Sequence, residues 1–122
     1  MISKDATYAV IWASNNENKY GYKVFYDLLK NKYHVIAINP NEKIILWKKV
    51  YATLSDVKEK IDVAIFVVPP KVTEIVLHEV FQLKITRVRM QPWSGNDTAI
   101  NFCKQNNIDY VANACIMIEK NK

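Results

Sequence analysis

Short apolar segments alternate along this chain with segments that are apolar on one side only. Residues 8–13 (YAVIWA) and 62–68 (DVAIFVV) are nearly continuous apolar runs, which is typical of parallel strands covered on both faces. Residues 20–30 instead repeat apolar side chains at helical spacing, with lysines on the other side. Strands and helices that alternate over short connections form an open parallel sheet with right-handed crossovers. The sequence therefore predicts an α/β fold that is Rossmann-like and doubly wound.

The predicted sheet is mostly parallel and has five to six strands in a single three-layer domain, residues 1–122. The expected strands are residues 8–13, 34–39, 49–52, 62–68, 87–91 and 109–114, with 49–52 at the edge. The expected helices are residues 20–30, 71–83 and 96–106, and a weak helical turn at 55–60 has Ser55 as its expected cap. The residues expected to face inward on the last two helices are Val72, Ile75, Val76, Val80, Ala99, Phe102 and Cys103.

Composition and charge exclude several functional classes. The net charge of +5 favours anionic partners, but no basic strip interleaved with aromatic residues is present, so nucleic-acid binding is not expected. The longest apolar runs, such as residues 63–70, are too short to cross a bilayer, and the first residues lack a signal-peptide core. Cys103 and Cys115 match no disulfide or metal-ligand spacing. We expect a cytoplasmic protein without a metal site.

The ligand of a doubly wound sheet lies outside the carboxyl ends of the strands, where the connections diverge to opposite faces. Four predicted loops converge there, at residues 14–22, 39–40, 68–70 and 91–95. The first loop is rich in asparagine, and it leads into the amino end of a helix, which offers backbone N–H groups to a phosphate. The mouth of the first strand is therefore the predicted site of a phosphate-bearing ligand.

Motifs for the common nucleotide-dependent enzymes are absent. The chain has two glycines, Gly21 and Gly95, so it contains neither the GxGxxG fingerprint of dinucleotide sites nor a P-loop. Asn39 stands where an NAD site places an acidic residue, which leaves NADP open as a minor alternative. His34 begins a predicted strand and His78 lies within a predicted helix, away from the predicted crevice. We expect no enzymatic activity of the chain by itself.

Several short pieces follow one another in an order that resembles a known family. They are Ala13-Ser14-Asn15, Asn18-Lys19-Tyr20, Ile38-Asn39-Pro40, the run from Tyr51 to Asp56, Asp62 before an apolar strand, Gln91 with a nearby glycine, and Asn113-Ala114-Cys115. In these pieces the chain is similar to stand-alone coenzyme A-binding proteins, whose fold is shared with the nucleotide-binding domain of succinyl-CoA synthetase. The resemblance covers nearly the whole length.

The resemblance implies roles for several of the matching residues. Ser14 and Asn15 would approach the pyrophosphate, and Lys19 would stand near a phosphate where the family usually has an arginine. A lysine is a point charge without the bidentate fork of arginine, so it would hold the phosphate less firmly. Asn39 and Pro40 would flank the adenosine half, and Val68 and Pro69 would form an apolar wall. The complete implied site is Trp12, Ala13, Ser14, Asn15, Lys19, Tyr20, Asn39, Pro40, Val68, Pro69, Gln91 and Cys115.

Two departures from the family pattern bear on the ligand. Trp12 stands where the pattern has a glycine that lets the backbone turn closely against the ligand. Trp93 and Ser94 are inserted between the glutamine and the glycine of the fifth-strand loop. The leading hypothesis is non-catalytic binding of coenzyme A or an acyl-CoA. The alternatives are an interaction or regulatory domain whose pocket is closed by Trp12, and an NAD(P)-binding protein.

Self-association is a further expectation of the sequence. Trp47 follows an apolar run, residues 44–46, in a loop near the predicted edge strand. Such a run either belongs to the core or forms a patch for a second subunit. The family that the chain resembles often self-associates, so we expect a homodimer.

Overall fold

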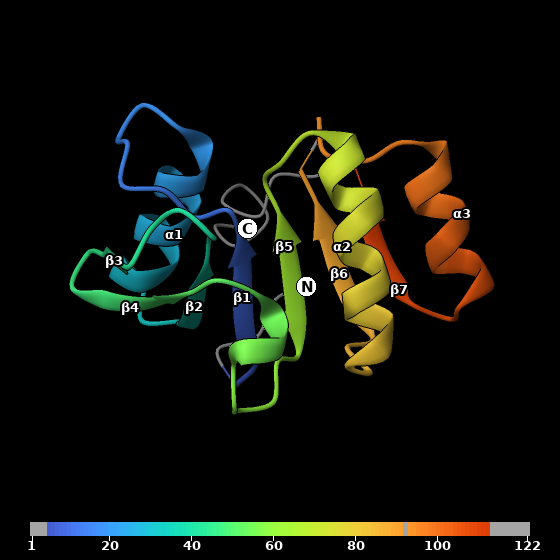
Figure 1. Cartoon of the computed structure of the whole chain (residues 1–122), viewed down its shortest axis with the longest axis horizontal. Coiled ribbons are helices and arrows are strands. Elements are labelled where there is room, and N and C mark those ends of the chain that lie inside the picture. The colour runs from blue at the N-terminus through green and yellow to red at the C-terminus, as the bar shows by residue number, and fades with distance from the viewer. Residues whose placement is uncertain (1–4, 92, 113–122) are drawn as a thin grey trace.

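The computed structural model describes residues 5–91 and 93–112, which form a seven-stranded sheet with helices on both faces (Figure 1). The strand order is β3-β4-β2-β1-β5-β6-β7. The strands are β1 (Thr7–Ile11), β2 (His34–Ile38), β3 (Ile44–Ile45), β4 (Lys48–Tyr51), β5 (Val63–Phe66), β6 (Arg87–Met90) and β7 (Asp109–Ala112). The helices are α1 (Tyr20–Lys30), α2 (Pro70–Gln82) and α3 (Asp97–Gln105), with a 3₁₀ turn η1 (Leu54–Asp56).

The predicted doubly wound α/β fold is confirmed, but the predicted strand number is wrong. All strand pairs are parallel except β3 with β4, which form an antiparallel hairpin. The extra strand, β3, has only two residues, too few for a period-two pattern to be visible in the sequence. Because β3 lies outside β4, the strand expected at the edge is instead paired on both sides.

The sheet separates two hydrophobic clusters because successive side chains of a strand point to opposite faces. Tyr8 and Val10 of β1 pack with α1, whereas Ala9 and Ile11 pack with the cluster that includes α2 and α3. β1 lies at the centre, between β2 and β5, and its residues from Tyr8 onward are buried. The connections that leave β1 and β5 turn to opposite faces, so the crevice expected for a ligand lies above these two strands (Figure 1).

Two details of the predicted helices are wrong. Ile75 is 70% exposed, because α2 turns Thr73, Leu77 and Val80 toward the core, and Ile75 lies on the opposite side of the helix. The cap of the turn after β4 is Thr53, whose hydroxyl pairs with Asp56 in a capping box.

The other residues that were expected to face inward on α2 and α3 are buried or partly buried, whereas Ser55 has another role than the expected cap. Ala99 and Cys103 are fully buried, as predicted, while Phe102, Val72 and Val76 are partly buried against the same cluster. The Ser55 hydroxyl donates to the Glu79 carboxylate, so Ser55 ties η1 to α2 and does not cap it.

All three helices end in the same way, without glycine. Lys32, Lys84 and Asn107 follow the helix ends with φ between 58° and 65°, in the left-handed region. The residue after each donates its N–H back across the last turn, as in Tyr33 to Leu28 and Ile85 to Val80. These are Schellman motifs, in which glycine is the usual left-handed residue. Each helix end therefore carries backbone strain that glycine would relieve.

Candidate functional site

A cleft of about 450 Å³ lies at the mouth of β1, where the sequence placed the ligand. Its volume falls within the range of small-molecule sites in proteins, roughly 300–1,000 Å³. The residues that line it come from the loops after β1, β2, β5 and β6, and they are Trp12, Ser14, Lys19, Tyr20, Gly21, Asn39, Val67, Pro69 and Trp93. The four loops that the sequence predicted to converge thus do meet in one cleft.

The turn out of β1 brings the backbone of Trp12 against the first turn of α1. Trp12 has φ 68°, and its N–H donates to the Ile38 carbonyl at 2.6 Å. A Cβ added to Gly21 would lie 2.4 Å from the Trp12 carbonyl oxygen, a distance that real Cβ atoms do not show. Gly21 is therefore required for this close approach. A glycine near the start of a predicted helix lowers helix propensity, so its presence at position 21 is a sequence signal that the backbone needs the space.

The loop from Ser14 to Lys19 holds itself together with short polar links. The Ser14 hydroxyl accepts from the N–H of Asn16, and the Asn16 side chain accepts from the N–H of Asn18. Ser14 is mostly buried and lines the cleft. Such turns, in which Ser or Asn accepts from the backbone two residues on, fix the path of the loop before α1.

Asn15, expected beside a pyrophosphate, instead joins the loop to the β3–β4 hairpin. Its N–H donates to the Glu42 carboxylate at 2.8 Å, and its side-chain amide donates to the Ile44 carbonyl at 2.8 Å. In the structure Asn15 is not among the residues that line the cleft. Ala13 is also behind the cleft, since it is fully buried in the cluster under α1.

Asn39 lines the cleft, and its side chain forms hydrogen bonds with backbone groups. Its amide nitrogen donates to the Ala13 carbonyl at 2.8 Å, and its side-chain oxygen accepts from the N–H of Asn41. These bonds tie the end of β2 to the end of β1. Pro40, the next residue, is exposed and does not line the cleft.

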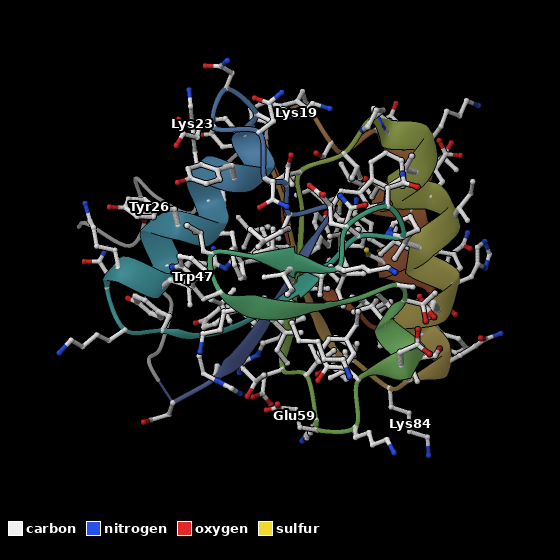
Figure 2. All side chains as sticks on the ribbon, turned by 60° about the vertical axis from the view of Figure 1, so that its left-hand side comes forward. Lys19, Lys23, Tyr26, Trp47, Glu59 and Lys84 are labelled. Atoms are coloured by element: carbon white, nitrogen blue, oxygen red, sulfur yellow. The ribbon has the colours of Figure 1, made fainter. Side chains whose placement is uncertain are left out.

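The walls of the cleft are apolar and aromatic, and one lysine supplies the charge. Tyr20 and Trp93 meet edge to face with ring centroids 4.5 Å apart, and Trp93 is 44% exposed. In the connection after β5 the wall is Val67 together with Pro69, because Val68 points to the other face and is buried with α2. Lys19 is the charged residue among the described lining residues, and it extends from the beginning of α1 as Lys23 does (Figure 2).

The site predicted from the sequence includes Val68, and it does not include Gly21, Val67 or Trp93, which line the cleft. The choice between Val67 and Val68 depends on strand register, which the sequence of an apolar run does not reveal. In the sequence, Trp93 stands out only as an insertion in the loop after the fifth predicted strand. Trp93 lies in the loop that follows a predicted parallel strand, and loops at the carboxyl ends of such strands line the ligand site. That position is the sequence signal for including Trp93.

Gln91 directly follows β6, and it is not among the residues that line the cleft. It is fully buried, its N–H donates to the Phe66 carbonyl, and its own carbonyl accepts from the N–H of Ser94. The side-chain oxygen and nitrogen of Gln91 have no hydrogen-bond partner among the described residues. The buried Ser94 hydroxyl accepts from the N–H of Val68, which holds the loop after β6 against β5. Cys115, the last expected site residue, lies outside the described residues.

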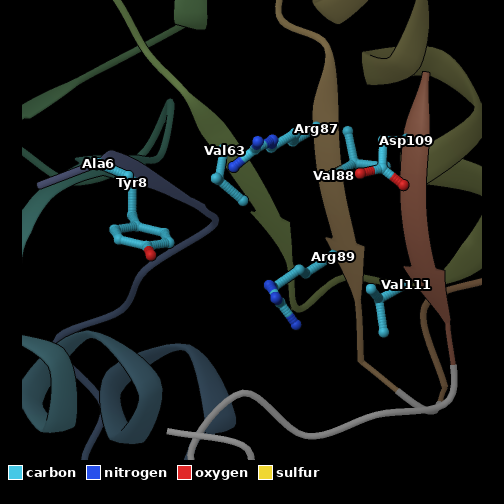
Figure 3. A pocket seen from close by; sticks show the side chains of 8 residues that line it. All are labelled: Ala6, Tyr8, Val63, Arg87, Val88, Arg89, Asp109 and Val111. Atoms are coloured by element: carbon cyan, nitrogen blue, oxygen red, sulfur yellow. The ribbon is translucent and has the colours of Figure 1, made fainter. Parts of the chain in front are cut away.

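A second hollow of about 250 Å³ lies on the α1 side of the sheet (Figure 3). Arg87 and Arg89 of β6 extend into it beside Tyr8, Val63 and Asp109. The strands begin at this end of the sheet, whereas ligands of doubly wound folds bind at the carboxyl ends. The cleft at the mouth of β1 is therefore the better candidate site.

The fold defines a doubly wound α/β protein, and its cleft lies at the carboxyl ends of the strands, where proteins of this fold bind their ligands. The chain belongs to the CoA binding domain family, whose model matches residues 6–121. The family resemblance expected from the sequence is thus confirmed.

Known relatives include enzymes that are much longer than this chain. It is 34% identical over 76 residues to an ADP-forming acetate–CoA ligase II of Archaeoglobus fulgidus, and 37% identical over 78 residues to an ADP-forming acetate–CoA ligase of Methanocaldococcus jannaschii. These matches cover 61% and 64% of this chain but only 11% of each ligase. A conserved hypothetical protein of Pyrococcus furiosus has the same fold, with a TM-score of 0.90, 32% identity, and coverage of 93% of this chain and 98% of that one.

Other chemical groups of the described chain lie away from the cleft. His34 is exposed and pairs with Glu59, and His78 of α2 packs edge to face on Phe102. Burial raises the pKa of the Cys103 thiol from 9.0 to about 11, so this thiol stays protonated and unreactive near neutral pH. Within residues 5–91 and 93–112, no helix has the length and apolar character needed to cross a bilayer.

Proposed function

We propose that this protein binds coenzyme A or an acyl-CoA in the cleft at the mouth of β1, without catalysing a reaction on it. The observation that carries the proposal is the cleft itself, in which apolar and aromatic walls adjoin Lys19 at the start of α1. The helix start and Lys19 suit a pyrophosphate, while Val67 and Pro69 suit the less polar parts of a nucleotide-type ligand. Family membership supports coenzyme A as that ligand.

The absence of a catalytic step is part of the same proposal. It is supported by the positions of His34, His78 and Cys103, none of which lines the cleft. The ligase relatives extend far beyond the region that this chain matches, so their reaction is not assigned to it. An NADP site is the weaker alternative, because both polar atoms of the Asn39 side chain already have backbone partners.

Calorimetric titration with coenzyme A, acetyl-CoA, NAD, NADP and ADP tests the proposal. We expect saturable heat from coenzyme A and acetyl-CoA, and weaker binding of ADP, which lacks the pantetheine arm. If none of the five ligands gives heat or a thermal shift at millimolar concentration, the proposal is overturned in favour of the interaction domain with a closed pocket. Saturable binding of NAD or NADP but not of coenzyme A would support the dinucleotide alternative.

The homodimer and the cytoplasmic location stay predictions. Trp47 is 96% exposed at the turn of the β3–β4 hairpin, and Ile44 beside it is 61% exposed, which supports a contact with a second copy. Sedimentation equilibrium of the wild type and of the Trp47→Gly variant tests this contact. We expect a dimer that the substitution weakens, and a wild-type monomer at all concentrations would contradict the prediction.

A further inference from the structure

The Gln91 side chain is a buried polar group whose hydrogen bonds are unsatisfied by the described part of the chain. It is fully buried, yet neither its oxygen nor its nitrogen finds a hydrogen bond among the described residues. Native proteins satisfy nearly all such groups, because burying a donor or acceptor without a partner destabilises the fold. An unsatisfied group therefore calls for an explanation, and a ligand that completes its hydrogen bonds is one.

The position of Gln91 ties it to the cleft. Phe66 pairs with Met90, so the next residues along the two parallel strands, Val67 and Gln91, are neighbours. Met90 packs with the α2 and α3 cluster, so alternation turns Gln91 to the opposite face, which it shares with Val67. Val67 lines the cleft. The Gln91 side chain thus lies on the same face of the sheet as Val67, next to the strand end that forms part of the cleft wall.

The chemistry of a carboxamide selects the kind of ligand group that fits. Gln91 offers one acceptor oxygen and an NH₂ donor, and neither has a partner within residues 5–91 and 93–112. A phosphate or carboxylate could satisfy only the donor, whereas an amide satisfies donor and acceptor together. Within coenzyme A, the two amide bonds of the pantetheine arm offer such a donor–acceptor pair, and so does the adenine edge with its N6 amino group and ring nitrogens. The narrow arm is the part that fits a route to a fully buried side chain.

We propose that Gln91 recognises an amide of the pantetheine arm, a role that rests on the proposed function. Because Gln91 is fully buried, the arm reaches it only when part of the wall moves. Trp93 is the wall residue nearest to it along the chain, and its ring is 44% exposed and held by an edge-to-face contact with Tyr20. The ring of Trp93 turns away from Tyr20 as the arm enters. Gln91 then discriminates ligands with the arm from nucleotides without it.

The test compares coenzyme A with 3′-phospho-ADP, which is coenzyme A without pantetheine, on wild type and on Gln91→Met. Methionine keeps the length of the side chain and removes both polar atoms. We expect the variant to unfold at a higher urea concentration, because an unsatisfied group has gone. We expect its affinity for coenzyme A to fall about tenfold and its affinity for 3′-phospho-ADP to stay unchanged.

Thr73→Val is the matched control. The Thr73 hydroxyl is also fully buried without a partner among the described residues, but it lies on the core side of α2. This variant should gain stability in the same way and keep the preference of the wild type for coenzyme A. A loss of that preference in Thr73→Val would contradict the assignment, since the preference would then follow core stability and not the carboxamide.

Each remaining outcome decides the matter. Equal affinity of wild type and Gln91→Met for coenzyme A overturns the assignment, as does an equal loss for both ligands. If the wild type binds neither ligand, the proposed function itself fails and the assignment fails with it. Should Gln91→Met not fold, ¹⁵N NMR of the wild type gives the answer. The Gln91 side-chain NH₂ signals should shift with coenzyme A and not with 3′-phospho-ADP, and unmoved signals at saturation would overturn the proposal.

Discussion

Replacing Trp12 by glycine and, separately, by alanine separates its backbone strain from the contribution of its ring. Trp12 has φ 68°, a conformation that costs a residue with a Cβ about 1–2 kcal/mol. Alanine keeps the Cβ and its strain, whereas glycine loses both. Glycine also has more freedom in the unfolded chain, which costs about 0.5–1 kcal/mol. The glycine variant should therefore be about 0.5–1 kcal/mol more stable than the alanine variant.

Both variants lose the same indole ring. Trp12 is 39% exposed, so roughly 100–150 Å² of its surface is buried, taking about 150–250 Å² for a fully buried aromatic residue. At about 25 cal/mol per Å², that burial is worth about 3 kcal/mol as an upper value. We expect Trp12→Ala to be about 3 kcal/mol less stable than wild type, and Trp12→Gly about 2 kcal/mol less stable.

Urea unfolding followed by circular dichroism measures these differences, with equal m-values as the sign that only stability has changed. If the alanine variant is as stable as the glycine variant, the left-handed conformation of Trp12 is refuted. The same two proteins test the cleft. Because Trp12 forms part of its wall, we expect both to bind coenzyme A about tenfold more weakly. Tighter binding by both would mean that Trp12 closes the pocket, as the alternative function requires.

Three further predictions concern single side chains. Lys19→Ala should weaken coenzyme A binding about tenfold and flatten the dependence of that affinity on salt, as measured by calorimetry. The Lys23 side chain does not line the cleft, so Lys23→Ala should leave the affinity and its salt dependence unchanged. If Lys19→Ala does not alter the salt dependence, Lys19 does not contact the phosphate. Lys84→Gly should raise the free energy of unfolding by about 1 kcal/mol because φ is 60° at this position. Leu83 has φ −85°, so Leu83→Gly should lower the free energy of unfolding. A lower free energy of unfolding in both variants would contradict the Schellman motif at the end of α2. The buried Cys103 thiol has its pKa raised from 9.0 to about 11, so the unfolded chain loses this proton first and the stability that depends on it falls as pH rises from about 9 to 11. Urea unfolding of wild type and Cys103→Ala between pH 8 and 11 should show their stabilities converging, and a constant difference would count against burial as the cause.

The elements of the fold follow closely from local sequence pattern. The apolar run that becomes β5 is stopped by two prolines, and α2 begins at the second of them, Pro70, as a preset φ and a missing N–H dictate. The helical spacing of α1 gave its bounds, residues 20–30, as the structure has them. Asn96 caps α3 because its side chain accepts a hydrogen bond from the N–H of Ala99, as expected for an asparagine at the N-cap position. These features depend on neighbours within a few positions, which the sequence displays directly.

Which residues face the cleft depends on contacts between distant segments. The sequence could not choose between Val67 and Val68, because both belong to a run that is apolar throughout and only register against β1 and β6 separates them. The sequence indicated Asn15 for a phosphate contact, but in the structure Asn15 forms hydrogen bonds with Glu42 and with Ile44 of β3. Both outcomes were set by pairing across the sheet, which no local pattern records.

The sequence by itself determined the fold class, the family and the end of the sheet at which the cleft lies. Periodicity, turn residues and the order of short motifs carry that information because they act over a few residues. The tertiary structure decided the shape of the site. It placed the left-handed Trp12 against Gly21, set Trp93 against Tyr20, and buried the Gln91 carboxamide without a partner in the part of the chain that the structure describes. These features exist only where segments far apart in the chain meet, and packing between them fixes what each side chain can touch.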